Sequence, residues 1–132
     1  VVDLLVNRAR SFIYTTGLPP AVAAAALAAI DVVRREPQRL ESMRANARRL
    51  REELRALGYD VPDGETPIIP VLVGDSGAAL DLSRRLLERG VFVQAIRPPT
   101  VPRGTARLRV TVMASHTSED LDFAVDAFRQ VR

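Results

Sequence analysis

The sequence contains no cysteine and no lysine, and it has a single histidine among 132 residues. Without cysteine, the chain has neither a disulfide framework nor a cysteine-based metal site. A lone histidine without carboxylates at metal-binding spacing does not hold a metal, so we expect none and assign His116 a structural role near the start of the last helix. Because lysine is absent, no lysine side chain here can form a Schiff base with an aldehyde cofactor.

Long hydrophobic runs are also missing. No apolar stretch reaches the roughly 20 residues needed to cross a bilayer, and nothing resembles a signal peptide. Apolar residues still make up 47% of the chain, which is enough for one hydrophobic core in a chain of this length. We therefore expect a folded, cytoplasmic domain that has no membrane partner.

Positive charge is carried by one residue type, because all 19 basic residues are arginine. Arginine does not titrate in the usual range, so the small excess that gives a net charge of +3 raises the pI to about 10.5. Arginine and glutamate are interleaved along predicted helices, as between Arg51 and Arg55, a pattern typical of a solvated helix face. We therefore expect no nucleic-acid partner, and a basic nucleic-acid module is the weakest functional interpretation.

Two helices are expected in the first half of the chain. An alanine-rich helix opens on two prolines, which suit a first helical turn, and runs over residues 20–35; Pro37 should break or sharply kink it. A second helix then extends to Leu57, with Gly58 as its C-terminal cap. Its apolar residues are spaced alternately by three and four and form one stripe: Leu40, Met43, Ala47, Leu50, Leu54 and Leu57.

The second half predicts the order strand, helix, strand, strand, helix. The strands are expected at residues 68–73, 91–96 and 106–112. Pro70 indicates that the first strand lies at an edge or contains a bulge. Ser76 is the expected N-cap of a helix that ends at Gly90, and Thr117, with an acid three residues later, predicts the start of the last helix. The expected fold is α+β, a small sheet with helices packed on one face.

The stretch over residues 95–112 carries the most informative pattern. Its three prolines forbid helix and stiffen an extended loop, and Gly104 permits a turn. In the strand that follows, apolar residues alternate with Arg107, Arg109 and Thr111, so one face displays two guanidinium groups and a hydroxyl. Such a strand is suited to holding an anion, but an edge strand with solvated arginines has the same pattern.

The order Ala-Ile-Arg-Pro-Pro-Thr-Val-Pro-x-Gly-Thr-Ala-Arg-Leu-Arg over residues 95–109 resembles the C-terminal domain of the α-oxoamine synthases, which use pyridoxal 5'-phosphate (PLP). Residues 12–20, 69–75 and 114–116 agree with the same family. The resemblance implies the C-terminal small domain of a fold-type-I PLP enzyme over residues 19–132, with residues 1–18 as a linker from a large domain. Because lysine is absent and the chain starts at Val1, we expect an inactive fragment of a longer enzyme.

The resemblance is strongest to the branch of the family that makes 8-amino-7-oxononanoate. It implies that the complete enzyme is a homodimeric acyltransferase of biotin biosynthesis, which condenses L-alanine with pimeloyl-CoA or a pimeloyl carrier protein and releases CO2. One alternative is a relative that uses glycine, of the glycine C-acetyltransferase or 5-aminolevulinate synthase type. Another is a non-catalytic dimerisation or binding domain that keeps the fold.

The resemblance also assigns the candidate site residues. Arg109 matches the position that binds the substrate carboxylate, although alternation alone does not separate it from Arg107. Thr100 matches a threonine that borders the active site; a hydrogen bond to its own backbone is the alternative. Thr15 and Thr16 match a pair that reaches the cofactor phosphate of the neighbouring subunit, where helix capping is the alternative. No catalytic residue is expected in this chain.

Overall fold

The computed structural model describes residues 1–11 and 13–132 in full, together with the backbone of residue 12. The chain divides into two compact units, Val1–Glu36 and Pro37–Arg132. The first contains α1 (Val2–Arg8), α2 (Arg10–Ile13) and α3 (Pro20–Arg35), and none of its described residues is buried. Helix α3 has the predicted bounds. The predicted division at residue 18 concerns a longer protein and stays a prediction.

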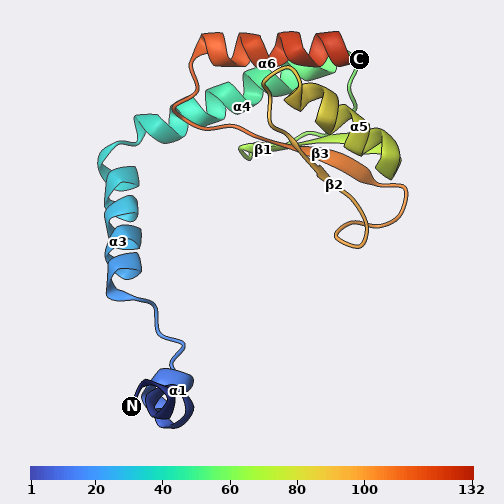
Figure 1. Ribbon diagram of the computed structural model, residues 1–132. Coiled ribbons are helices and arrows are strands. Elements are labelled where there is room, and N and C mark those ends of the chain that lie inside the picture. Colours follow the sequence, from blue (N-terminus) through green and yellow to red (C-terminus); the bar gives the residue numbers. More distant parts are fainter. The chain divides into compact units, whose positions relative to one another are not determined.

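The second unit is an α+β fold, as Figure 1 shows. Its three strands form one antiparallel sheet in the order β1-β3-β2, and the helices of this unit cover one face of that sheet (Figure 1). The predicted fold class is therefore confirmed. Its elements are α4 (Gln38–Ala56), β1 (Ile68–Gly74), α5 (Ser76–Leu87), β2 (Gln94–Ile96), β3 (Ala106–Thr111) and α6 (Ser118–Val131).

The core lies between the sheet and the helices of the second unit. Ile69 and Val71 of β1 stand opposite Val110 and Leu108 of β3, and all four are buried against residues of α4 and α6. The largest fully buried side chains are Phe128, Leu54, Ile69, Leu86, Leu108, Val71 and Val131. The apolar stripe predicted on α4 is confirmed from Ala47 to Leu54, whereas Leu40 is 38% exposed.

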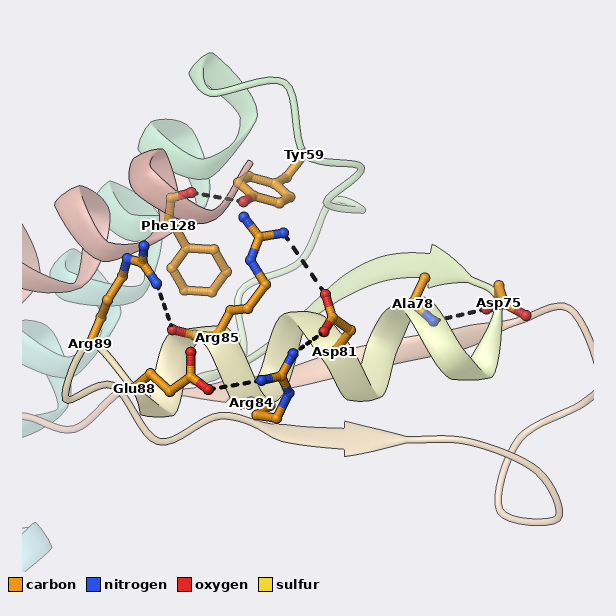
Figure 2. A network of polar contacts seen from close by, with 9 residues as sticks. All are labelled: Tyr59, Asp75, Ala78, Asp81, Arg84, Arg85, Glu88, Arg89 and Phe128. Carbon is orange, nitrogen blue, oxygen red and sulfur yellow. Dashed lines mark hydrogen bonds and ion pairs between the residues drawn. The ribbon is translucent and has the colours of Figure 1, made fainter.

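Tyr59 closes one end of this core. Its ring packs edge-on against Phe128 at a centroid distance of 5.3 Å, and its hydroxyl donates to the Phe128 carbonyl at 2.8 Å (Figure 2). Burial raises the pKa of Tyr59, because the charged form is poorly solvated there. The chain after α4 is thereby fixed to α6.

Strand β1 is an edge strand, as Pro70 predicted. Strand β2 is shorter than predicted, since pairing covers Gln94–Ile96 and not residues 91–96. The reason is a competing set of bonds to α5. The Val91 N–H donates to the Leu86 carbonyl at 3.0 Å, and the Val93 carbonyl accepts from the Ser83 hydroxyl at 2.5 Å.

Helix α5 differs from the prediction at both ends. Its N-cap is Asp75 and not Ser76, because Asp75 Oδ1 accepts from the Ala78 N–H at 2.8 Å (Figure 2). The helix ends at Leu87 and not at Gly90, since the Gly90 N–H turns back to the Leu87 carbonyl at 2.9 Å. Asp75 has the extended backbone (φ −79, ψ 139) of an N-cap residue, whereas Ser76 is already the first residue of the helix.

The outer face of α5 carries the interleaved charges that the sequence predicted. Arg84 donates to Asp81 at 2.5 Å and to Glu88 at 2.9 Å, and Arg85 Nη1 lies 3.9 Å from Asp81 (Figure 2). These side chains are all at least 37% exposed, so each pair contributes little to stability. Within the described residues, no helix is both long enough and apolar enough to cross a membrane.

Helix α6 begins with the predicted cap. Thr117 Oγ1 accepts from the Asp120 N–H at 3.2 Å, and Asp120 Oδ2 accepts from the Thr117 N–H at 2.8 Å. This reciprocal pair satisfies two amides that a helix start leaves free. The bond from the Thr117 backbone, followed by the bond with its side chain, holds the pKa of Asp120 below its ordinary value.

We expect Asp120→Asn to lower the free energy of unfolding at neutral pH, and the difference from wild type to shrink as the pH falls. The pKa of Asp120 is lower in the folded state than the unfolded value of about 3.9. Its stabilising contribution is therefore present above that value and is lost as the pH falls through the folded pKa. Urea unfolding of both proteins across this range measures the effect.

Glu119→Gln is the matched control, because it removes a carboxylate from the same helical turn and that side chain has no hydrogen-bond partner among the described residues. We expect its difference from wild type to change much less with pH. A constant difference between wild type and Asp120→Asn across the acid range would contradict the role of the capping bonds.

Candidate functional site

The open face of the sheet carries the two predicted arginines, and its register gives them different neighbours. Arg109 of β3 lies between Pro70 of β1 and Gln94 of β2. It is exposed, as is Thr111, which lies two residues along the same face. Leu108, Val110 and Val112 are buried on the opposite side. The alternation predicted for this strand is confirmed.

Arg109 bonds to a neutral partner. Its Nη2 donates to Gln94 Oε1 at 2.7 Å, and no carboxylate pairs with it among the described residues. The positive charge of Arg109 is therefore held in place without being compensated. This arrangement suits a guanidinium that receives a carboxylate from outside the chain, because the planar fork still has two parallel donors to offer.

Arg107 has a different environment on the same face. Its Nε donates at 3.0 Å to the carbonyl of Thr105, the residue before β3, and its cross-strand neighbours are Leu72 and Ile96. Arg107 is half-buried, so its aliphatic stem contributes to packing. The structure thus separates two arginines that alternation alone did not.

A hollow of about 460 Å³ brings the two predicted substrate-binding residues, Thr100 and Arg109, together with Arg107, the alternative that alternation left open. Pro70 and Ile96 also line it. Thr100 lies in the loop between β2 and β3, and its N–H donates to the Arg97 carbonyl at 3.1 Å. Its hydroxyl has no hydrogen-bond partner within the described part of the chain, so the side chain does not bond its own backbone.

Arg51 is a lining residue that the sequence interpretation placed wrongly. It was expected on a solvated helix face, but it is only 4% exposed and lines the same hollow. Its Nη2 donates to the carbonyls of Thr66 at 3.1 Å and Ile68 at 3.4 Å, whereas its buried Nε has no partner. Burial, followed by the charge of Arg55, lowers the pKa of Arg51.

The sequence did contain a signal for the burial of Arg51. Position 51 lies four residues after Ala47 and three before Leu54, which places it on the apolar stripe of α4. Because arginine is charged, the sequence interpretation assigned this position to the solvated face and not to the apolar stripe. The hollow also includes one acid, Asp63, but its carboxylate already accepts from Arg55 at 2.7 Å. The lining residues therefore carry an excess of positive charge.

Thr15 and Thr16 lie in the first unit, between α2 and α3, and both are exposed. Neither caps α3, because the N-cap is Pro19 and no side chain bonds there. Their hydroxyls have no hydrogen-bond partner among the described residues. Neither hydroxyl is therefore used in helix capping, and the role of these residues in binding the cofactor phosphate stays a prediction.

His116 lies in the turn before α6. Its Nδ1 accepts from the Met113 N–H at 3.3 Å, and Asn46 of α4 donates to the His116 carbonyl at 2.9 Å and the Met113 carbonyl at 3.2 Å. These bonds tie the turn to α4, which is a structural use of the residue. No group of three potential metal ligands occurs within the described residues.

Residues 1–128 match the family described as aminotransferase class I and II. The chain is 50% identical over 131 residues to an 8-amino-7-oxononanoate synthase of Symbiobacterium thermophilum, covering 99% of this chain and 33% of that protein. It is 49% identical over 129 residues to a Thermus thermophilus protein named 8-amino-7-oxononanoate synthase/2-amino-3-ketobutyrate coenzyme A ligase, with 98% and 33% covered. The chain thus spans about one third of the length of these curated relatives.

A solved structure agrees with this match. A serine palmitoyltransferase from S. paucimobilis with bound PLP-myriocin aldimine has a TM-score of 0.83 and 29% sequence identity, and the alignment covers 98% of this chain and 33% of that chain. The fold and the resemblance that the sequence suggested are both confirmed by these similarities.

The loop that carries Thr100 depends on Gly104. This residue has a φ of +77°, and no neighbouring atom lies within 4 Å of the place that a Cβ would occupy. A side chain at this position therefore meets backbone strain but no clash. We expect Gly104→Ala to lower the free energy of unfolding by about 1–2 kcal/mol. Gly104→Asn should cost less, because asparagine tolerates the left-handed region. Urea unfolding of the two variants measures this, and equal stability of wild type and Gly104→Ala would contradict it.

Proposed function

The chain belongs to the aminotransferase class I and II family, and we propose that it is the C-terminal small domain of an 8-amino-7-oxononanoate synthase. The complete enzyme condenses L-alanine with pimeloyl-CoA, or with a pimeloyl carrier protein, and releases CO2 in biotin biosynthesis. It is a cytoplasmic homodimer with PLP as cofactor. The observation that carries the proposal is the uncompensated guanidinium of Arg109, held on a central strand beside Thr100 in one hollow.

PLP fits this chain only at its phosphate. The chain has no lysine, so covalent attachment falls to residues outside these 132. Thr15 and Thr16 offer exposed hydroxyls without partners, and we assign them to the cofactor phosphate of the partner subunit. When bound, PLP withdraws electrons from the α-carbon of the amino acid. This chain's own contribution is to hold the substrate.

Arg109 holds the carboxylate of L-alanine in two parallel charge-assisted hydrogen bonds. Two bonds fix the plane of the carboxylate, so the adjacent Cα–H bond is oriented for proton removal. A fixed reacting geometry lowers the entropic part of the barrier. Thr100 offers a free hydroxyl on the wall of the same hollow, where it donates a further hydrogen bond to the bound substrate.

A glycine-using synthase is the second candidate. The observation that favours it is the Thermus thermophilus relative, whose name includes 2-amino-3-ketobutyrate coenzyme A ligase. The test is product formation by the complete, PLP-loaded enzyme with alanine or glycine, each offered with pimeloyl-CoA or acetyl-CoA. Highest turnover with alanine and pimeloyl-CoA supports the first proposal. Preference for glycine and acetyl-CoA supports the second, and no turnover with any pair contradicts both.

In the complete enzyme, we expect Arg109→Ala to weaken alanine binding by roughly 2–5 kcal/mol, since the carboxylate is left unpaired. Arg109→Lys should weaken it less, because lysine restores the charge but not the planar fork. Binding is measured by titrating alanine against the absorption of bound PLP, and the KM for the acyl thioester should change much less.

Arg107→Ala is the matched control from the same face of the strand, and its effect on alanine binding should be milder. If Arg107→Ala abolishes alanine binding while Arg109→Ala binds as wild type does, the carboxylate site belongs to the other arginine. If neither variant changes the affinity, the open face of the sheet is not an anion site.

A further inference from the structure

We propose that Gln94 is a positioning residue for Arg109, which fixes the guanidinium for the substrate carboxylate without neutralising its charge. The inference rests on the proposed function, because the ligand of Arg109 is the carboxylate of an amino-acid substrate. It extends the site to a strand and a side chain that the sequence pattern did not single out.

The register of the sheet places the two residues directly side by side. Gln94 of β2 is the cross-strand partner of Arg109 of β3, and Gln94 Oε1 accepts from Arg109 Nη2 at 2.7 Å. Directly paired residues on one face have Cβ atoms about 5 Å apart, so the amide meets the guanidinium close to their shared strands. This contact limits the directions in which the long arginine side chain can turn.

The backbone of Gln94 is itself anchored. The preceding residue, Val93, is 3% exposed, and its carbonyl accepts from the Ser83 hydroxyl of α5 at 2.5 Å. Because side chains alternate along a strand, the packing of Ala95 of β2 against the core directs Gln94 to the open face. The core and α5 thus fix the position of the Gln94 amide, and the amide in turn fixes the position of the Arg109 guanidinium.

Hydrogen-bond capacity allows both partners at once. A guanidinium has five N–H donors, and an amide oxygen that accepts from one of them leaves four. A carboxylate needs two parallel donors from adjacent nitrogens, and the second N–H of Nη2 remains free for such a pair. Gln94 therefore orients the fork and does not occupy it.

The neutral partner distinguishes Arg109 from those arginines of the second unit that pair with carboxylates. Arg49 pairs with Asp122, Arg84 with Asp81 and Glu88, and Arg129 with Asp126. A carboxylate at position 94 would likewise form an ion pair with Arg109 and compete with the substrate. Glutamine supplies the same reach and an acceptor oxygen, but it leaves the full positive charge for the incoming anion.

The test uses the complete, PLP-loaded enzyme with Gln94→Glu and Gln94→Met. Gln94→Glu keeps the size but pairs with Arg109, so we expect the KM for alanine to rise by at least about tenfold. Gln94→Met keeps the length without an acceptor and should raise that KM less. In both variants kcat at saturating alanine and the KM for the acyl thioester should stay close to wild type.

The chain provides a matched control in a second glutamine–arginine pair. Gln130 Oε1 of α6 accepts from Arg89 Nε at 3.2 Å, and neither residue belongs to a strand of the sheet. Gln130→Glu introduces the same charge beside an arginine and should leave the KM for alanine unchanged. An unchanged KM in Gln94→Glu overturns the proposal, as does a fall in kcat without a change in the KM for alanine.

A second readout separates this proposal from the proposed function. In the 132-residue chain, propionate titrated against the Arg109 side-chain NMR signal should give a saturable shift that Gln94→Glu abolishes and Gln130→Glu preserves. If the complete enzyme makes no product from alanine and pimeloyl-CoA, the proposed function fails, but this titration still decides the role of Gln94. An identical shift in wild type and Gln94→Glu overturns that role.

Discussion

The structure of the second unit depends on the two different faces of the central strand, β3. Leu108, Val110 and Val112 of this strand are buried on one side, while its arginines face the opposite way. A slip of one residue would bring the guanidinium groups into the core and expose the leucine and valines. The cost of burying a charge therefore fixes the register, and the register in turn sets Pro70 and Gln94 on either side of Arg109.

Local signals predicted most of the fold. The bounds of α3, the cap of α6 and the edge position of β1 each depend on residues close together in the sequence. The differences arise where distant groups compete for the same bond. Residues 91–93 are held by bonds to α5 in place of strand pairing. The sequence of residues 91–96 does not predict that competition, because the donor hydroxyl of Ser83 lies on another element.

In the candidate site too, local sequence predicted some features, whereas contacts between distant residues decided others. Alternation predicted which residues share a face, but it did not separate Arg107 from Arg109, because both obey the same period. Their cross-strand neighbours separate them: an amide beside Arg109, and aliphatic side chains beside Arg107. Arg51 was misplaced for a related reason. Its burial depends on carbonyls of residues 66 and 68, which sequence spacing from α4 does not reveal.

The charges around the hollow explain why it suits an anion. Its one acid, Asp63, is already paired with Arg55, and Arg109 has only an amide beside it. Arg51 is buried and bonded to neutral carbonyls, with its Nε left without a partner. A cation kept away from water and from carboxylates lowers the stability of a fold. An anion that enters the hollow offsets this cost, so part of the attraction for the substrate carboxylate is already present in the folded domain as uncompensated charge.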